Sequence, residues 1–135
     1  MSRYLLDTSI WVSWLKGDEA LSNRLDALID PDEAEVWSCG PVRLELLRGT
    51  DAADQQLIRE TFNLAPSAPV EEFDFDEAAT IYHLARSRGH TIRSSLDCLI
   101  AAVALRLDFV VVHRDVDFVR MASAIPALSV IDLTA

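Results

Sequence analysis

Several residue types and patterns are scarce in this chain of 135 residues, and each scarcity excludes a class of protein. Only four glycines are present, which rules out a phosphate-cradling glycine loop or a dinucleotide-binding fingerprint. The two cysteines, Cys39 and Cys98, lack the spacing of a zinc site and are expected to be buried free thiols. No apolar run reaches the ~18–20 residues that a membrane-spanning helix needs. No signal-peptide pattern is visible at the N-terminus, so a cytoplasmic protein is expected.

Basic residues are also few. The chain has 12 Lys and Arg against 22 Asp and Glu, for a formal net charge of −10, and Lys16 is the single lysine. This balance argues against a protein that binds nucleic acid by covering its phosphates with basic side chains. It is compatible with an enzyme whose acidic residues hold metal ions, because the metal then supplies the positive charge.

Half of the residues are hydrophobic and a quarter are charged, as in an ordinary globular protein, and the length suits one domain over residues 1–135. The predicted strands are 4–6, 35–39, 70–75, 109–112 and 128–133, and the predicted helices are 9–15, 21–29, 41–49, 51–64, 77–89 and 94–107. We expect Asp76 to cap the helix 77–89, and a serine to cap the helix 94–107. This alternation predicts an α/β fold, a three-layer α/β/α sandwich around a mainly parallel sheet.

Acidic residues occur where such a sheet binds its ligands. Parallel sheets bind ligands beyond the carboxyl ends of their strands. Asp7 follows the first predicted strand, and Asp115 and Asp117 follow the apolar strand 109–112. Glu45 interrupts the apolar segment VRLELL, and Asp97 lies in the first turn of an otherwise apolar helix.

Each of these acids also has a simpler explanation. Asp7 would cap the helix after it, and Asp97 would complement a helix dipole. Glu45 would pair with Arg43 or Arg48 on a solvent face, and the two later acids would be turn formers. Together, however, four or five carboxylates at one cleft would repel one another without a cation. Mg²⁺ and Mn²⁺ prefer such oxygen ligands, and with them the set suits hydrolysis of a phosphodiester.

With these motifs the chain resembles the PIN-domain ribonucleases, and in particular VapC-type toxins of bacterial toxin–antitoxin pairs. The segments that carry the resemblance are LLDTSIWV, VRLELLRG, SLDCLIAAVA and VVVHRDVDF, and their order and spacing agree from Arg3 to Leu133. The resemblance implies a PIN-like fold and a metal-dependent endoribonuclease with a Mg²⁺ or Mn²⁺ site.

The resemblance also implies roles for single residues. Asp7 and Asp97 match the principal metal ligands, and Glu45 completes the triad directly or through water. Asp115 matches the fourth acid best, with Asp117 as the second candidate. The remaining matches are Thr8 and Ser9, which would hydrogen-bond a ligand carboxylate or a metal-bound water, and Arg114, which would contact RNA phosphates. Arg43, Arg48 and Arg93 are weaker candidates for the same contact.

Partners follow from the resemblance as well. Members of the family cleave structured RNA, form homodimers and are held inactive by a small DNA-binding antitoxin, here of the VapB type. The antitoxin's tail is expected to lie across the acidic groove. A membrane partner is not expected.

Two other classes of protein fit this sequence less well. In a phosphatase or receiver domain, Asp7 would be phosphorylated, but Ser9 stands where a phosphatase has its second Asp, and Lys16 is the only lysine available to a receiver. A non-catalytic interaction module would have no reason to keep self-repelling acids. Within the ribonuclease interpretation, we expect Asp115 to reach the metal and Asp117 to cap a short helix that begins near Phe118.

Overall fold

The computed structural model describes residues 2–134, which form a parallel sheet of five short strands. The strands are β1 (Ser2–Leu6), β2 (Ala34–Cys39), β3 (Ser67–Ala68), β4 (Val110–His113) and β5 (Val130–Asp132). Their order across the sheet is β3-β2-β1-β4-β5, with β1 at the centre between β2 and β4. All four pairings are parallel, as the sequence predicted.

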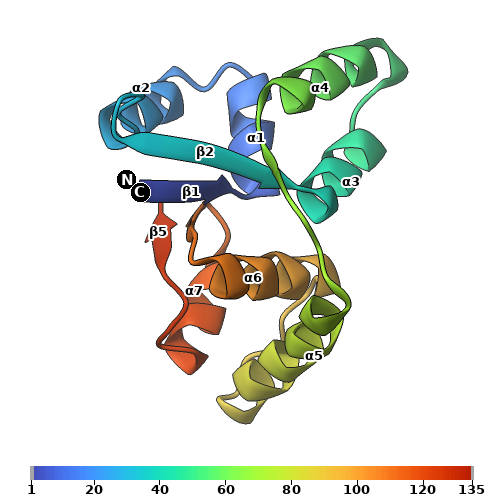
Figure 1. The fold of residues 1–135 in the computed structure, drawn as a ribbon, viewed down its shortest axis with the longest axis vertical. Coiled ribbons are helices and arrows are strands. Elements are labelled where there is room, and N and C mark those ends of the chain that lie inside the picture. The colour runs from blue at the N-terminus through green and yellow to red at the C-terminus, as the bar shows by residue number, and fades with distance from the viewer. Residues whose placement is uncertain (1, 135) are drawn as a thin grey trace.

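Seven helices connect these strands within the described range. They are α1 (Thr8–Leu15), α2 (Glu19–Leu28), α3 (Gly40–Gly49), α4 (Ala52–Leu64), α5 (Glu72–Ser87), α6 (Ser95–Leu107) and α7 (Val116–Ala124). Helices α1 to α4 gather on one side of the sheet and α5 to α7 on the other (Figure 1). The three-layer α/β/α architecture expected from the sequence is therefore confirmed. No helix in this part of the chain is long and apolar enough to cross a membrane.

Helix α6 is buried, and small and branched apolar side chains cover most of its own surface. Seven of its residues from Cys98 to Ala104 are buried, in agreement with the predicted apolar helix. Ser94 is its N-cap residue, as expected, but the Ser94 side chain makes no capping hydrogen bond. Cys39 and Cys98 are both buried free thiols, as expected.

The segment 70–75 is not a strand. Helix α5 begins at Glu72, about one turn before the predicted start, so Asp76 lies inside the helix and does not cap it. The backbone N–H of Glu71 donates to Asp74 Oδ2 at 2.8 Å, as part of a capping box. Asp74 also receives two hydrogen bonds from Arg106 of α6, both at 2.9 Å. This partner lies 32 residues away in the sequence, so the local alternation was misleading.

Candidate functional site

The carboxyl ends of β1 and β4 bring two of the predicted acids to the same edge of the sheet. Asp7 follows β1 directly and Asp115 follows β4 by two residues, and these strands pair with each other. Glu45 comes to this edge from α3, and Asp97 comes from the first turn of α6. An open cleft of about 530 Å³ results, lined by Asp7, Thr8, Ser9, Val12, Ser13, Glu45, Arg93, Ser94, Asp97, Arg114, Asp115 and Asp117. Every acid predicted for the site therefore lines one cleft.

Asp7 is buried, and its two carboxylate oxygens have different environments. Oδ2 accepts the backbone N–H of Ser9 at 3.2 Å and the Ser9 hydroxyl at 2.7 Å, so Asp7 does cap α1. Oδ1 is buried and has no hydrogen-bond partner among residues 2–134. Burial raises the pKa of Asp7 to about 6, although the bonds from Ser9 oppose the rise. Capping and a ligand role are compatible here, because each uses a different oxygen.

Asp97 is the most perturbed acid of the cleft. Its side chain is buried, and none of the described residues donates a hydrogen bond to its carboxylate. Burial, followed by the negative charges of Asp7, Glu45 and the two later acids, raises its pKa to about 8. Oxygens of Asp97, Asp115 and Asp117 lie within 4.8 Å of one another. A divalent cation would relieve both the repulsion and the lost hydration.

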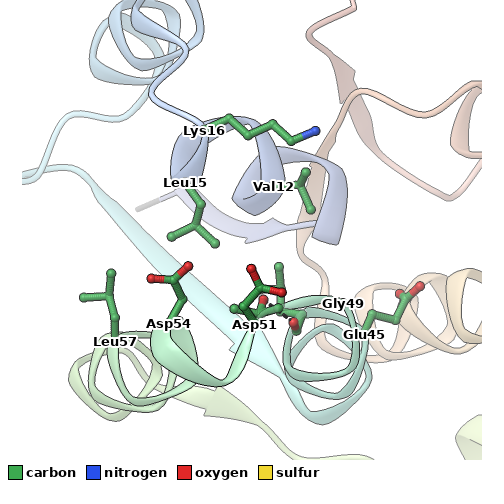
Figure 2. Close-up of a pocket in the computed structure, with 10 residues that line it drawn as sticks. Val12, Leu15, Lys16, Glu45, Gly49, Asp51, Asp54 and Leu57 are labelled. Atoms are coloured by element: carbon green, nitrogen blue, oxygen red, sulfur yellow. Dashed lines mark hydrogen bonds between the residues drawn. The ribbon is translucent and has the colours of Figure 1, made fainter.

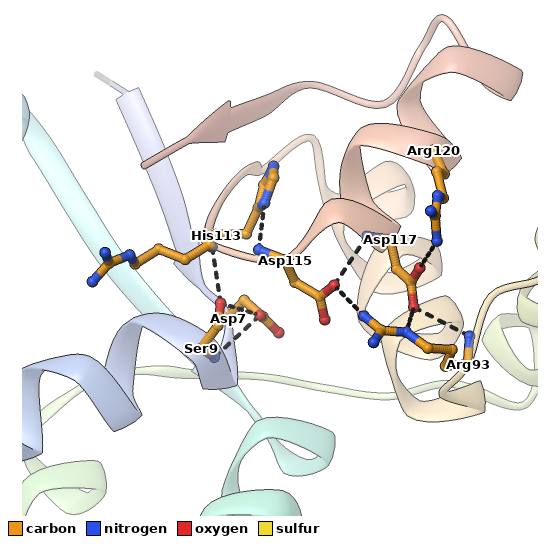
Figure 3. A network of polar contacts seen from close by, with 8 residues as sticks. Asp7, Ser9, Arg93, His113, Asp115, Asp117 and Arg120 are labelled. Atoms are coloured by element: carbon orange, nitrogen blue, oxygen red, sulfur yellow. Dashed lines mark hydrogen bonds and ion pairs between the residues drawn. The ribbon is translucent and has the colours of Figure 1, made fainter. Parts of the chain in front are cut away.

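The hydroxyl pair after Asp7 serves two different acids. Thr8 Oγ1 donates to Glu45 Oε1 at 3.0 Å, and Ser9 Oγ donates to Asp7 Oδ2. Ser9 Oγ also accepts the backbone N–H of Arg114 at 2.9 Å, which ties the end of β4 to the start of α1 (Figure 3). The proposed ion pairs of Glu45 with Arg43 or Arg48 are absent among the described residues.

Asp115, and not Asp117, caps the helix that follows β4. Helix α7 begins at Val116, and Asp115 is its N-cap, with Oδ1 accepting the backbone N–H of Asp117 at 3.0 Å. The expectation that Asp117 caps the helix is therefore wrong. Asp117 lies in the first turn, buried, with Arg93 and Arg120 on its two oxygens. Burial raises its pKa, but the bonds from Arg93 and Arg120 outweigh burial, and the net shift is downward.

The backbone around Asp115 is held by a residue that the sequence analysis did not single out. His113, the last residue of β4, is fully buried, and its Nδ1 accepts the backbone N–H of Asp115 at 3.2 Å. Burial lowers the pKa of His113, which favours the neutral imidazole that can accept this bond. In the sequence, the only sign of this role is a histidine at the end of an apolar strand.

The arginines of the cleft are engaged with acids. Arg114 donates through Nη1 to Ser13 Oγ at 3.1 Å and to Asp18 Oδ2 at 2.8 Å. Arg93 contacts Asp115 and Asp117, and its side chain remains 68% exposed. Arg43 and Arg48, the other two candidates for RNA contact, do not line this cleft.

A second hollow adjoins the cleft between α1 and the α3–α4 pair. Its volume is about 440 Å³, and Val12 and Glu45 belong to both cavities. Figure 2 shows Glu45 at one end and Leu57 at the other, with Asp51 and Asp54 between them. The acidic surface therefore continues beyond the cleft.

Comparisons with known proteins agree on one family. The PIN domain matches residues 4–124 of this chain. Ribonuclease VapC11 of Mycobacterium tuberculosis and VapC ribonuclease Mb1587 of Mycobacterium bovis are each 38% identical over 117 residues, which cover 84% of this chain and 87% of theirs. The structure of VapBC-1 from nontypeable Haemophilus influenzae is similar in fold, with a TM-score of 0.74 at 20% identity, covering 98% of this chain and 99% of that one. VapBC2 from Rickettsia felis, bound to a promoter DNA fragment, has the same TM-score at 18% identity, covering 96% and 98%.

Proposed function

Since this chain belongs to the PIN-domain family, we propose that it is a metal-dependent endoribonuclease and the toxin of a VapBC-type toxin–antitoxin pair. One observation carries the proposal beyond the family match. Asp7 and Asp97 are buried residues that line a single cleft; within residues 2–134 Asp7 Oδ1 is buried without a hydrogen-bond partner, and the Asp97 carboxylate receives no hydrogen bond. Such groups are costly in a folded protein unless a cation or a substrate completes them.

These residues suit Mg²⁺ or Mn²⁺, which prefer carboxylate oxygens and retain several waters. Asp7 and Asp97 would be the principal ligands, and Asp115 would bind through Oδ2, since its Oδ1 is used in capping. Glu45 would complete the set directly or through water. Asp117 is the weakest of the candidate ligands, because both of its oxygens are already occupied by arginine donors.

The bound metal would lower the pKa of a water molecule and stabilise negative charge on the phosphate. The residues of this chain supply the rest. Ser9 holds Asp7 by two hydrogen bonds, so Oδ1 keeps a fixed direction. The bond from Thr8 occupies Oε1 of Glu45 and leaves Oε2 able to accept a proton from the attacking water. Asp97, protonated at neutral pH without metal, would release its proton when a cation binds.

The partners are proposed on the same basis. RNA would be the substrate, a VapB-type antitoxin would inhibit the enzyme, and the active unit would be a homodimer. The related solved structures from Haemophilus influenzae and Rickettsia felis are of VapBC complexes.

The test is cleavage of RNA by the purified chain with Mg²⁺, with Mn²⁺, and with excess EDTA. We expect cleavage only with metal, and its loss in Asp7→Asn and Asp97→Asn. Asp32→Asn, at an exposed acid outside the cleft, removes the same charge and should leave activity unchanged. Circular dichroism should show all three variants folded. Undiminished cleavage in EDTA, or equal loss in Asp32→Asn, would overturn the proposal.

A further inference from the structure

The buried carboxylate of Asp117 is used entirely to hold two arginines. Oδ2 accepts the backbone N–H and the Nε–H of Arg93, both at 3.1 Å, and Oδ1 accepts Nη1 of Arg120 at 3.1 Å. The Asp117 side chain is only 1% exposed. A buried anion with several charge-assisted bonds has little freedom to move, so it fixes the direction of both guanidinium groups.

The two arginines differ in where they point. Arg93 lines the cleft, and its Nη2 donates to Asp115 Oδ1 at 3.1 Å, whereas Arg120 does not line the cleft. Figure 3 shows Arg93 between the two carboxylates, with Arg120 approaching Asp117 from the other side. The Arg93 side chain is 68% exposed, and its Nη1 has no partner in the range 2–134. Arg93 thus presents free N–H groups to solvent beside the candidate metal ligands.

An exposed ion pair alone would contribute little and would need no function. Arg93 differs, because its Nε and its backbone N–H are both bound to one buried oxygen. This arrangement orders the long side chain before any ligand binds, so binding loses less conformational entropy. The guanidinium fork matches the oxygens of a phosphate, and the cleft is otherwise dominated by acids that would repel one.

We propose that Arg93 binds a phosphate oxygen of the RNA substrate beside the metal site, with Asp117 as the positioning residue that orients it. The inference rests on the proposed ribonuclease function and assigns a substrate contact within it. A further consequence follows from charge. Arg93 partly neutralises Asp115 in the metal-free cleft, so its removal should strengthen the attraction for Mg²⁺ and weaken the attraction for RNA.

The experiment compares Arg93→Gln and Arg93→Lys with the matched control Arg120→Gln, which removes a partner of the same carboxylate outside the cleft. Steady-state cleavage of a labelled single-stranded RNA in Mg²⁺ gives KM and kcat. A charge-assisted hydrogen bond is worth roughly ten-fold or more in affinity, so Arg93→Gln should raise KM by about that factor. The KM of Arg93→Lys should lie between those of the wild type and Arg93→Gln, because lysine keeps the charge but lacks the paired N–H donors of the guanidinium group. The KM of Arg120→Gln should stay within about two-fold of the wild-type value.

Two further readouts separate substrate contact from a purely structural role. The slope of log(kcat/KM) against log[salt] should become shallower by about 0.7 in Arg93→Gln, the value for one phosphate contact on a single strand. Melting curves of Arg93→Gln in Mg²⁺ without RNA should reach half of their full shift at a Mg²⁺ concentration equal to or lower than that of the wild type. Loss of the Mg²⁺ response in Arg93→Gln, or equal KM values for Arg93→Gln and Arg120→Gln, would overturn the inference. A wild-type chain that does not cleave RNA would instead refute the proposed function on which it rests.

Discussion

Asp97 combines burial with a carboxylate that receives no hydrogen bond from residues 2–134, and its pKa is raised to about 8. Burial is the largest cause of the raised pKa, and the surrounding acids add to it. In an unfolded chain the same group titrates near 3.8. The folded protein therefore binds more protons than the unfolded protein between these two values, and its stability falls as the pH rises through this range.

This sign leads to a prediction for the metal-free protein. Asp97→Asn removes the titrating group, so its melting temperature should exceed that of the wild type by an amount that grows from pH 5 to pH 8. The lowered pKa of buried His113 acts in the opposite direction below pH about 6.5, but both proteins share it. Melting curves in EDTA at several pH values measure the difference. A constant or shrinking difference would show that Asp97 is not strained by burial and repulsion.

Asp115 offers a second prediction, because capping and metal binding can be separated by choice of substituent. Asparagine caps helices about as well as aspartate, whereas alanine costs about 0.5–2 kcal/mol. Asp115→Asn should therefore keep its stability and lose metal-dependent cleavage. Asp115→Ala should lose both. Denaturant unfolding and RNA cleavage on the two variants provide the check, and an active Asp115→Asn would remove Asp115 from the proposed ligands.

At the scale of elements, the pairing of α5 with α6 depends on a buried ion pair at its end. Asp74 is fully buried, and Arg106 donates to both of its oxygens and to the carbonyl of Pro69. Breaking such a pair leaves an unpaired buried charge, so Arg106→Leu should lower the free energy of unfolding by roughly 3–5 kcal/mol. The exposed Arg86→Leu is the control and should change stability by about 0.5 kcal/mol or less.

The pH dependence of this loss identifies its cause. Although Asp74 is buried, the bonds from Arg106 hold its pKa below 3.8, so the stabilisation exists above that value and is lost as the pH falls. The destabilisation by Arg106→Leu should accordingly shrink in acid, where Asp74 is protonated in the variant. Chemical unfolding at pH 7 and pH 3 measures this. An equal loss at both values would indicate lost packing of the arginine stem instead.

At the scale of the whole molecule, four segments far apart in the sequence supply the cleft, so the proposed metal site would exist only in the folded chain. A ligand that binds only the folded state stabilises it, by about 2.7 kcal/mol at a hundred times its dissociation constant. Saturating Mg²⁺ should raise the melting temperature at pH 8. The rise should be smaller at pH 5, where protons compete for Asp7 and Asp97. Asp97→Asn should reduce the rise in melting temperature with Mg²⁺ at both pH values. An unchanged rise in that variant would show that the ion binds elsewhere.

The sequence by itself determined the order of the elements, the parallel sheet and the family. Strand and helix periodicities depend on local residue patterns, and the four motifs in order were enough to indicate a PIN domain, which the family match over residues 4–124 confirms. The same patterns placed Asp7 and Asp115 after strands. Because parallel strands share one ligand edge, their convergence followed from topology alone.

Only the tertiary structure decided how each acid is used. The roles of Asp115 and Asp117 depend on where α7 begins and on Arg93, which lies 24 residues from Asp117 in the chain. The start of α5 depends in the same way on Arg106. A carboxylate's pKa and its free oxygens are set by burial and by donors that other elements bring to it. Local sequence carries no record of those donors, so it identified the acids of the cleft but not the bonds that distinguish one from another.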